Sequence, residues 1–132
     1  RFVFSVLRNH VLARGRKSMD AAADQAAVIE GIRAGRVWFA DDRLADSRGF
    51  FLGSADGIRT MGDAFFAGEP VKVRIPERAK IVVKKNGTTF AEMEGREMEF
   101  SPDAPGAYRV EVKYRNAPWI FANPIFVEGG EE

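Results

Sequence analysis

The chain contains no cysteine and only one histidine in 132 residues. The lack of cysteine excludes disulfides, thiol catalysis, iron–sulfur clusters and cysteine-ligated zinc sites. One histidine is too few for a multi-histidine metal site or a zinc-protease motif built from this chain alone. No apolar run approaches the roughly 20 residues that a membrane-spanning helix needs. We therefore predict no metal site within this chain and no membrane association.

An excess of charge of one sign is also lacking, because 20 basic residues are balanced by 19 acidic ones. The net charge of +1 creates no overall field that would favour nucleic acid, so we expect no nucleic-acid partner. The length suits one domain. The chain starts at Arg1 without an initiator methionine or a secretory signal, which indicates a piece of a longer, cytoplasmic polypeptide.

Residues 1–36 predict a helical lead-in made of two short helices. In residues 1–13, apolar side chains recur at the spacing of a helix face, at Phe4, Leu7 and Val11. A second helix is expected between Ser18, which suits an N-cap, and Gly35, which suits the position after the last turn. We expect this lead-in to be the end of, or a bridge to, a catalytic domain that the chain does not contain.

From Val37 onward the apolar pattern changes to a period of two, which is typical of β-strands. The pattern predicts strands at residues 37–41, 48–54, 71–75, 80–85, 88–94, 97–100, 107–114 and 120–127. Between the fourth and fifth of these, Asn86-Gly87 predicts a tight hairpin, since both residues tolerate positive φ. Short strands without intervening helices favour an antiparallel sandwich over a parallel sheet.

A tyrosine near the penultimate strand makes this expectation more specific. The run from Asp103 to Tyr108 resembles the tyrosine corner of immunoglobulin-like domains, in which a tyrosine hydroxyl bonds to the backbone a few residues upstream. Val110 stands where antibody domains carry their second cysteine. We therefore predict a mainly β fold: an immunoglobulin-like antiparallel β-sandwich over residues 37–132, preceded by the two short helices.

Few residues of the sequence suggest a catalytic or ligand-binding role. His10 is interpreted as a packed or surface residue, with a ligand or catalytic role as the alternative, because no second ligand stands beside it. The densest carboxylate cluster is Asp41, Asp42 and Asp46, but it lacks the calcium-loop pattern. Arg43 and Arg48 can neutralise this cluster, so we interpret it as a solvated turn with local ion pairs, and a weakly bound cation is the alternative.

The most distinctive stretch is aromatic and apolar and runs from Pro118 to Val127, with Trp119 near its start. Asn123 precedes Pro124, which predicts a bulge or a strand break there. Such a stretch is either a final core strand or a surface on which another domain docks. His10, Asp41, Asp42, Arg43, Trp119 and Asn123 are therefore the candidate binding or docking residues, and none is predicted to be catalytic.

Three passages carry a family resemblance. The segment Gly106 to Val112, followed by Pro118 to Val127, resembles the C-terminal end of PHP-type (polymerase and histidinol phosphatase) metal-dependent phosphoesterases. The runs from Leu7 to Leu12 and from Ala27 to Asp42 are similar to the passage that follows the catalytic barrel in such proteins. The segment from Ala45 to Leu52 is similar to the start of their appended sandwich.

The resemblance implies a non-catalytic C-terminal accessory domain that packs on the catalytic domain of the same polypeptide. In that family, clustered histidines and acidic residues hold divalent metal ions that activate a water. Those ligands match no residue of this chain, so the metal ions are expected in the absent catalytic domain. The alternative function is a free-standing β-sandwich that binds a carbohydrate or a protein. A surface left exposed by the missing domain would also favour a homodimer.

Overall fold

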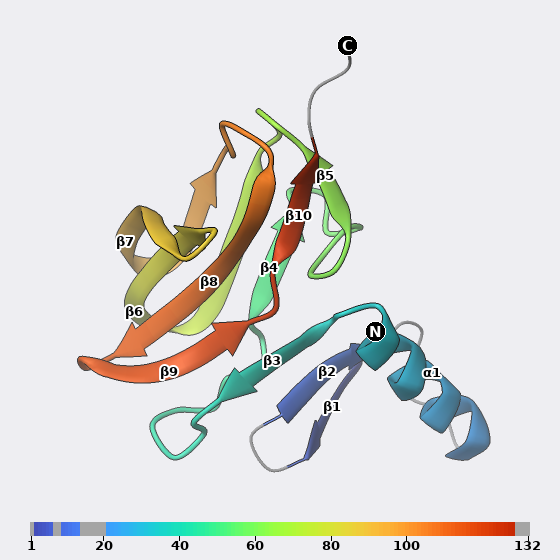
Figure 1. Ribbon diagram of the computed structural model, residues 1–132. Helices are drawn as coiled ribbons and strands as arrows, with labels where there is room; N and C mark the ends of the chain where they lie inside the picture. The colour runs from blue at the N-terminus through green and yellow to red at the C-terminus, as the bar shows by residue number, and fades with distance from the viewer. Residues whose placement is uncertain (1, 7–8, 14–20, 129–132) are drawn as a thin grey trace.

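The computed structural model describes residues 2–6, 9–13 and 21–128, which contain one helix and ten strands (Figure 1). The helix α1 spans Ala21–Arg33. The strands are β1 (Phe2–Val6), β2 (Asn9–Ala13), β3 (Val37–Ala40), β4 (Phe51–Ser54), β5 (Ala64–Phe66), β6 (Val71–Lys85), β7 (Thr88–Phe100), β8 (Gly106–Tyr114), β9 (Ala117–Ala122) and β10 (Ile125–Glu128). The prediction of a mainly β fold is confirmed.

The strands form one branched sheet. One path through it follows the order β1-β2-β3-β9-β8-β10-β5, and β6 joins this path through β8. Strand β6 also pairs with β4 and β7. All strand pairs are antiparallel except β10 with β5, which run parallel. Because β2 pairs with β3, the sheet is continuous across the expected boundary at residue 36.

The prediction of a helix over residues 1–13 is wrong, since residues 2–6 and 9–13 form the antiparallel strands β1 and β2. Strand β2 is covered on both faces, since His10, Val11 and Leu12 are all buried. Its apolar residues therefore do not alternate with polar ones, and their spacing resembles that of a helix face. Leu7 lies outside the described residues. The described part of the lead-in therefore consists of two paired strands and one helix.

The second predicted helix is confirmed as α1, although Ser18 lies outside the described residues. Gly35 has φ +84° and ends the helix, and the amide of Arg36 donates to the carbonyl of Gly31 over 2.9 Å. A Cβ on Gly31 would lie 2.9 Å from the carbonyl oxygen of Leu12, so the helix lies directly against β2. A Cβ on Gly62 would lie 1.7 Å from the carbonyl oxygen of Ala34, so only glycine allows this loop to contact the end of the helix.

Two pairs of predicted strands are single strands in the structure. Residues 71–85 form the continuous strand β6, which shifts register against β7 between Arg74 and Ala79. Pro76 lies at this irregularity, where the regular hydrogen bonding between the strands is interrupted. Its lack of an N–H donor is therefore tolerated there. Strand β7 likewise continues from residue 88 to residue 100. The predicted break at Asn123-Pro124 is confirmed, because β9 ends at Ala122 and β10 begins at Ile125.

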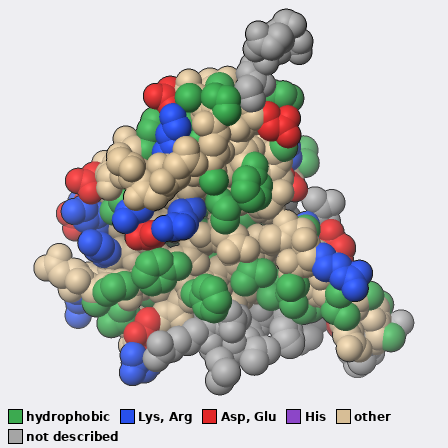
Figure 2. Space-filling view, viewed as in Figure 1, with side chains coloured by type: hydrophobic (Ala, Val, Ile, Leu, Met, Phe, Trp, Pro, Cys, Tyr) green, Lys and Arg blue, Asp and Glu red, His purple; other side chains and the backbone are tan. Residues whose placement is uncertain are grey.

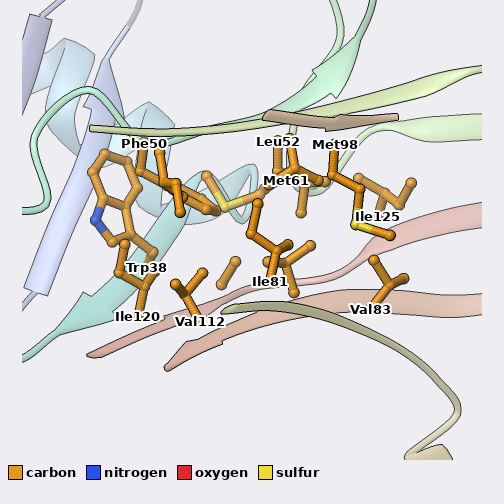
Figure 3. Packing of buried hydrophobic residues seen from close by; sticks show 14 of the residues in the cluster. Trp38, Phe50, Leu52, Met61, Ile81, Val83, Met98, Val112, Ile120 and Ile125 are labelled. Carbon is orange, nitrogen blue, oxygen red and sulfur yellow. The ribbon is translucent and has the colours of Figure 1, made fainter. Parts of the chain in front are cut away.

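The hydrophobic core lies between the two parts of this bent sheet. Figure 3 shows Phe50, Leu52 and Met98 on one side of the core, and the side chains that meet them come from the opposite side at Trp38, Val112 and Ile120. Leu52 and Ile120 have no exposed surface, and Trp38 is 1% exposed. Burial of this kind stabilises the fold by about 1.5–3 kcal/mol for each large apolar side chain.

The expected local geometry is present in the β6–β7 turn and at the start of β8. Asn86 and Gly87 adopt φ values of +50° and +89°, which confirms the tight hairpin between β6 and β7. The buried Tyr108 hydroxyl donates to the carbonyl oxygen of Ala104 over 2.7 Å. The predicted bond from Tyr108 to upstream backbone is therefore confirmed, and it fixes the segment that leads into β8.

This bond gives a test of stability. Tyr108→Phe is expected to lower the free energy of unfolding by about 0.5–1.5 kcal/mol, since it removes a hydrogen bond to a part-buried carbonyl. Urea denaturation followed by circular dichroism measures this change. Tyr114→Phe is the matched control, because no hydrogen bond of the Tyr114 hydroxyl is present among the described residues. Equal losses of unfolding free energy in the two variants would contradict a stabilising hydrogen bond from Tyr108 to Ala104.

Candidate functional site

Five of the six candidate residues lie at the C-terminal end of β3. Trp38 points into the core and Phe39 points outward, as successive residues of a strand do. The acidic loop follows directly, and the amide of Asp41 donates to the carbonyl of Trp119 over 2.8 Å. Strand β2 brings His10 alongside Trp38. Residues far apart in the sequence therefore meet around this one strand end.

His10 is a packed residue, 2% exposed. Its ring stacks on Trp38 with 5.2 Å between centroids and 11° between planes. Its Nε2 lies 2.8 Å from Oδ2 of Asp42 and 3.2 Å from Oγ of Ser47. The indole Nε1 of Trp38 donates to the same Ser47 oxygen over 3.2 Å. We call His10, Trp38, Asp42 and Ser47 the buried polar cluster, in which the Asp42 side chain is 35% exposed and closes the cluster toward the surface.

The buried polar cluster contains a serine, a histidine and an aspartate, but its geometry is not that of a catalytic triad. In a triad the two imidazole nitrogens contact different partners, so that a proton passes from serine to histidine while aspartate orients the ring. Here Asp42 and Ser47 both contact Nε2. Ser47 is also fully buried, so its oxygen is closed to a substrate. The cluster therefore holds β2, β3 and the acidic loop together.

The acidic loop is neutralised locally, which confirms its interpretation as a turn with ion pairs. Arg43 donates to both carboxylate oxygens of Asp41, from Nε over 2.9 Å and from Nη2 over 2.8 Å. Arg48 contacts Asp46 in the same way, with Nη2 2.6 Å from Oδ2. The hydrogen bonds from Arg48 lower the pKa of Asp46 to about 2. In the described part of the chain, no three His, Asp or Glu side chains are grouped as metal ligands would be.

Trp119 lies below an open groove of about 350 Å³. The indole itself is fully buried and donates from Nε1 to the carbonyl of Ala45 over 2.8 Å. The outer walls are Phe39 and Phe121, which are 52% and 42% exposed and lie directly opposite each other on β3 and β9. Asp41 lines the same groove. An ion-paired carboxylate thus borders two exposed aromatic rings.

The groove belongs to a wider apolar surface. Figure 2 shows a band of hydrophobic side chains that passes over β9 and β3 toward α1. Exposed apolar side chains on these elements are Phe39, Phe121, Ile29 and Ile32. We call these four residues the apolar face. Phe121 belongs to the stretch that the sequence offered as a docking surface, whereas Phe39, Ile29 and Ile32 were not predicted. The alternation of Trp38 and Phe39 on opposite faces of one strand was a usable signal.

Asn123 lies away from the other candidates, near the start of β3. Its Nδ2 donates to the carbonyl of Gly35 over 3.3 Å, and its backbone amide donates to the carbonyl of Val37 over 3.1 Å. These bonds attach the chain between β9 and β10 to the segment that follows α1. The side chain of Asn123 therefore has a structural contact and does not line the groove.

Comparison of the chain with protein-family models, with curated proteins and with solved structures found no match. Within residues 2–6, 9–13 and 21–128, no helix is long and apolar enough to cross a membrane.

The Asp46–Arg48 pair predicts a shifted titration. Arg48→Gln removes the hydrogen bonds that stabilise the carboxylate, so the pKa of Asp46 is expected to rise from about 2 toward its ordinary value of 3.8. Because the pKa is low in the folded state, this pair contributes stability above about pH 4 and loses it as the pH falls toward 2. Nuclear magnetic resonance of the side-chain carboxyl carbon measures the pKa. Arg43→Gln, which alters the neighbouring pair, should leave the pKa of Asp46 unchanged, and an equal rise would contradict this assignment.

Proposed function

We propose that this chain is a non-catalytic accessory domain of a cytoplasmic, PHP-type metal-dependent phosphoesterase, and that it packs on the catalytic domain through the apolar face. The divalent metal ions and the hydrolytic chemistry would belong to that catalytic domain. The role of this chain would be to shape substrate access or assembly. The sequence resemblance suggests the family, and the apolar face supports a docking role.

The observation that carries the proposal is the exposed, directly opposed pair of Phe39 and Phe121. Scattered single apolar residues are ordinary on protein surfaces, whereas a group on neighbouring elements is typical of an interaction surface. Asp41 and Arg43 border this group with a satisfied ion pair. An aromatic centre with a polar rim is the usual composition of a protein–protein interface.

An immunoglobulin-like topology is part of the same proposal. The Tyr108 corner and the core position of Val110 support it. The bend of the β6–β7 hairpin, which folds the sheet over the core, is also consistent with two facing layers. The hairpin β1–β2 and helix α1 would then be an addition at one edge that contributes Ile29 and Ile32 to the apolar face.

The buried indoles argue against carbohydrate as the ligand of a free-standing module. Carbohydrate sites on sandwiches display exposed, coplanar aromatic rings, and the indoles are the usual choice. Trp38 is 1% exposed and Trp119 has no exposed surface. A protein surface suits Phe39 and Phe121 better, either on the catalytic domain or, when this chain is alone, on a second copy. Self-association of the isolated chain would therefore use the same face.

The proposal predicts protection of one face. In the whole polypeptide, hydrogen exchange at residues 37–40 and 117–122 should be slower than in the isolated chain, because docking covers these strands. The double variant Phe39→Ser with Phe121→Ser is expected to weaken docking by on the order of tenfold or more, since the centre of an interface carries most of its binding energy. Protease cleavage between the domains should increase accordingly.

Phe66→Ser is the matched control, because Phe66 is 58% exposed but lies on β5, away from the apolar face. Equal sensitivity of the control and the double variant would overturn the assignment of the face. A coding sequence upstream of Arg1 without clustered histidine and acidic metal ligands would overturn the phosphoesterase assignment while leaving the docking face to be judged by the exchange experiment.

A further inference from the structure

We propose that an open groove at the bend of the β6–β7 hairpin binds a compact, multivalent phosphate anion. This inference does not rest on the proposed function. The groove has a volume of about 440 Å³ and lies between the bends of β6 and β7 and the turn that joins β8 to β9. Five cationic side chains line it, from four segments of the chain: Arg78, Lys80, Arg96, Lys113 and Arg115.

The positive charge in this groove exceeds its local compensation. Two carboxylates also line the groove, Glu77 and Glu94, but neither forms an ion pair among the described residues. Of the five cations only Lys80 has a carboxylate partner there, with its Nζ 3.5 Å from Oε1 of Glu92. A chain of net charge +1 therefore concentrates unpaired cations at one place.

The strand register adds an independent observation. Lys80 and Lys113 are direct partners across β6 and β8. Like charges directly opposite each other destabilise a sheet. Lys113 has no carboxylate within ion-pair distance among the described residues. A lysine at position 113 therefore lowers the stability of the sheet, and no ion pair of Lys113 within the described residues offsets that loss, which is typical of a functional position.

The same two strands provide a comparison. Lys84 and Arg109 are also direct partners across β6 and β8. Glu111 compensates both of them, lying 3.5 Å from Nζ of Lys84 and 3.2 Å from Nε of Arg109. Both members of that pair are thus compensated by one carboxylate of this chain. In the groove, Lys80 has Glu92 and lies opposite Glu94, whereas Lys113 has no carboxylate partner among the described residues and is left for an external anion. On the left of the view in Figure 2, Lys and Arg side chains lie interspersed with Asp and Glu side chains, next to the hydrophobic band.

The lining side chains favour phosphate groups over a larger ligand. Guanidinium groups match the oxygens of phosphate in paired hydrogen bonds, and ammonium groups act as point charges beside them. The one aromatic ring in the lining is not free to stack on a base. Tyr114 packs against Trp119 at 5.4 Å, and the Arg115 guanidinium lies 5.2 Å from the centre of its ring. The recognised chemistry is therefore the phosphate chain, either free or at the end of a nucleotide.

Titration of the chain with tripolyphosphate, followed by calorimetry and by amide chemical shifts, tests this site. We expect saturable binding at low salt, with shifts at residues 78–80, 94–96 and 113–116 and an affinity that falls steeply as salt rises. Lys113→Gln and Arg96→Gln are each expected to weaken binding by about tenfold. Arg109→Gln is the matched control: it removes one positive charge from the same strand outside the groove and should weaken binding less than about twofold.

Two further measurements separate phosphate binding in the groove from a loss of folding and from recognition of a nucleotide base. The melting temperature of the unliganded Lys113→Gln variant should be unchanged or higher by up to about 3 °C, since the variant relieves the opposition to Lys80. Adenosine triphosphate should bind within a few-fold of tripolyphosphate. Absence of tripolyphosphate binding at millimolar concentration, an equal loss in the Arg109→Gln control, or far tighter binding of the nucleotide would each overturn the assignment.

Discussion

The imidazole of His10 is buried between the indole of Trp38 and the carboxylate of Asp42, and this contact, together with the β2–β3 ladder, fixes the position of β2 against the rest of the sheet. The Nε2 atom joins β2 to the loop that follows β3, and Ser47 links the same loop to the indole. Burial of these polar groups is tolerated because each has a hydrogen-bond partner. With β2 held in this position, α1 packs on its outer face and Phe39 remains exposed beside it.

The sequence predicted the parts of the fold that depend on short-range signals. The Asn86-Gly87 hairpin, the end of α1 at Gly35 and the bond of Tyr108 depend on residues within a few positions of one another, and all three are present. The β1–β2 hairpin was mistaken for a helix because α1 covers the outer face of β2, so burial there does not alternate. The continuity of β6 through Pro76 was missed because the bulge is set by pairing with β7.

The candidate surfaces also divide into features that short-range sequence signals predict and features that depend on strand pairing. The ion pairs of the acidic loop join residues two positions apart, so the sequence indicated that Arg43 and Arg48 neutralise it. The pairing of Phe39 with Phe121, and of Lys80 with Lys113, depends on strand order and register, which composition and periodicity do not specify. The two surfaces proposed here therefore became visible only in the folded chain. One is apolar and suits a protein partner, and the other is cationic and suits an anion.

Native-state hydrogen exchange tests most directly whether the buried polar cluster makes the N-terminal segment and the sheet one cooperative unit. The amide of Leu12 donates to the carbonyl of Arg36 over 2.9 Å and reports on β2, while the amide of the buried Val112 reports on the centre of the sheet. We predict that both amides exchange through the same global unfolding, with equal free energies and equal dependence on denaturant. Exchange of Leu12 through a local opening of much lower free energy, with Val112 still protected, would contradict this coupling.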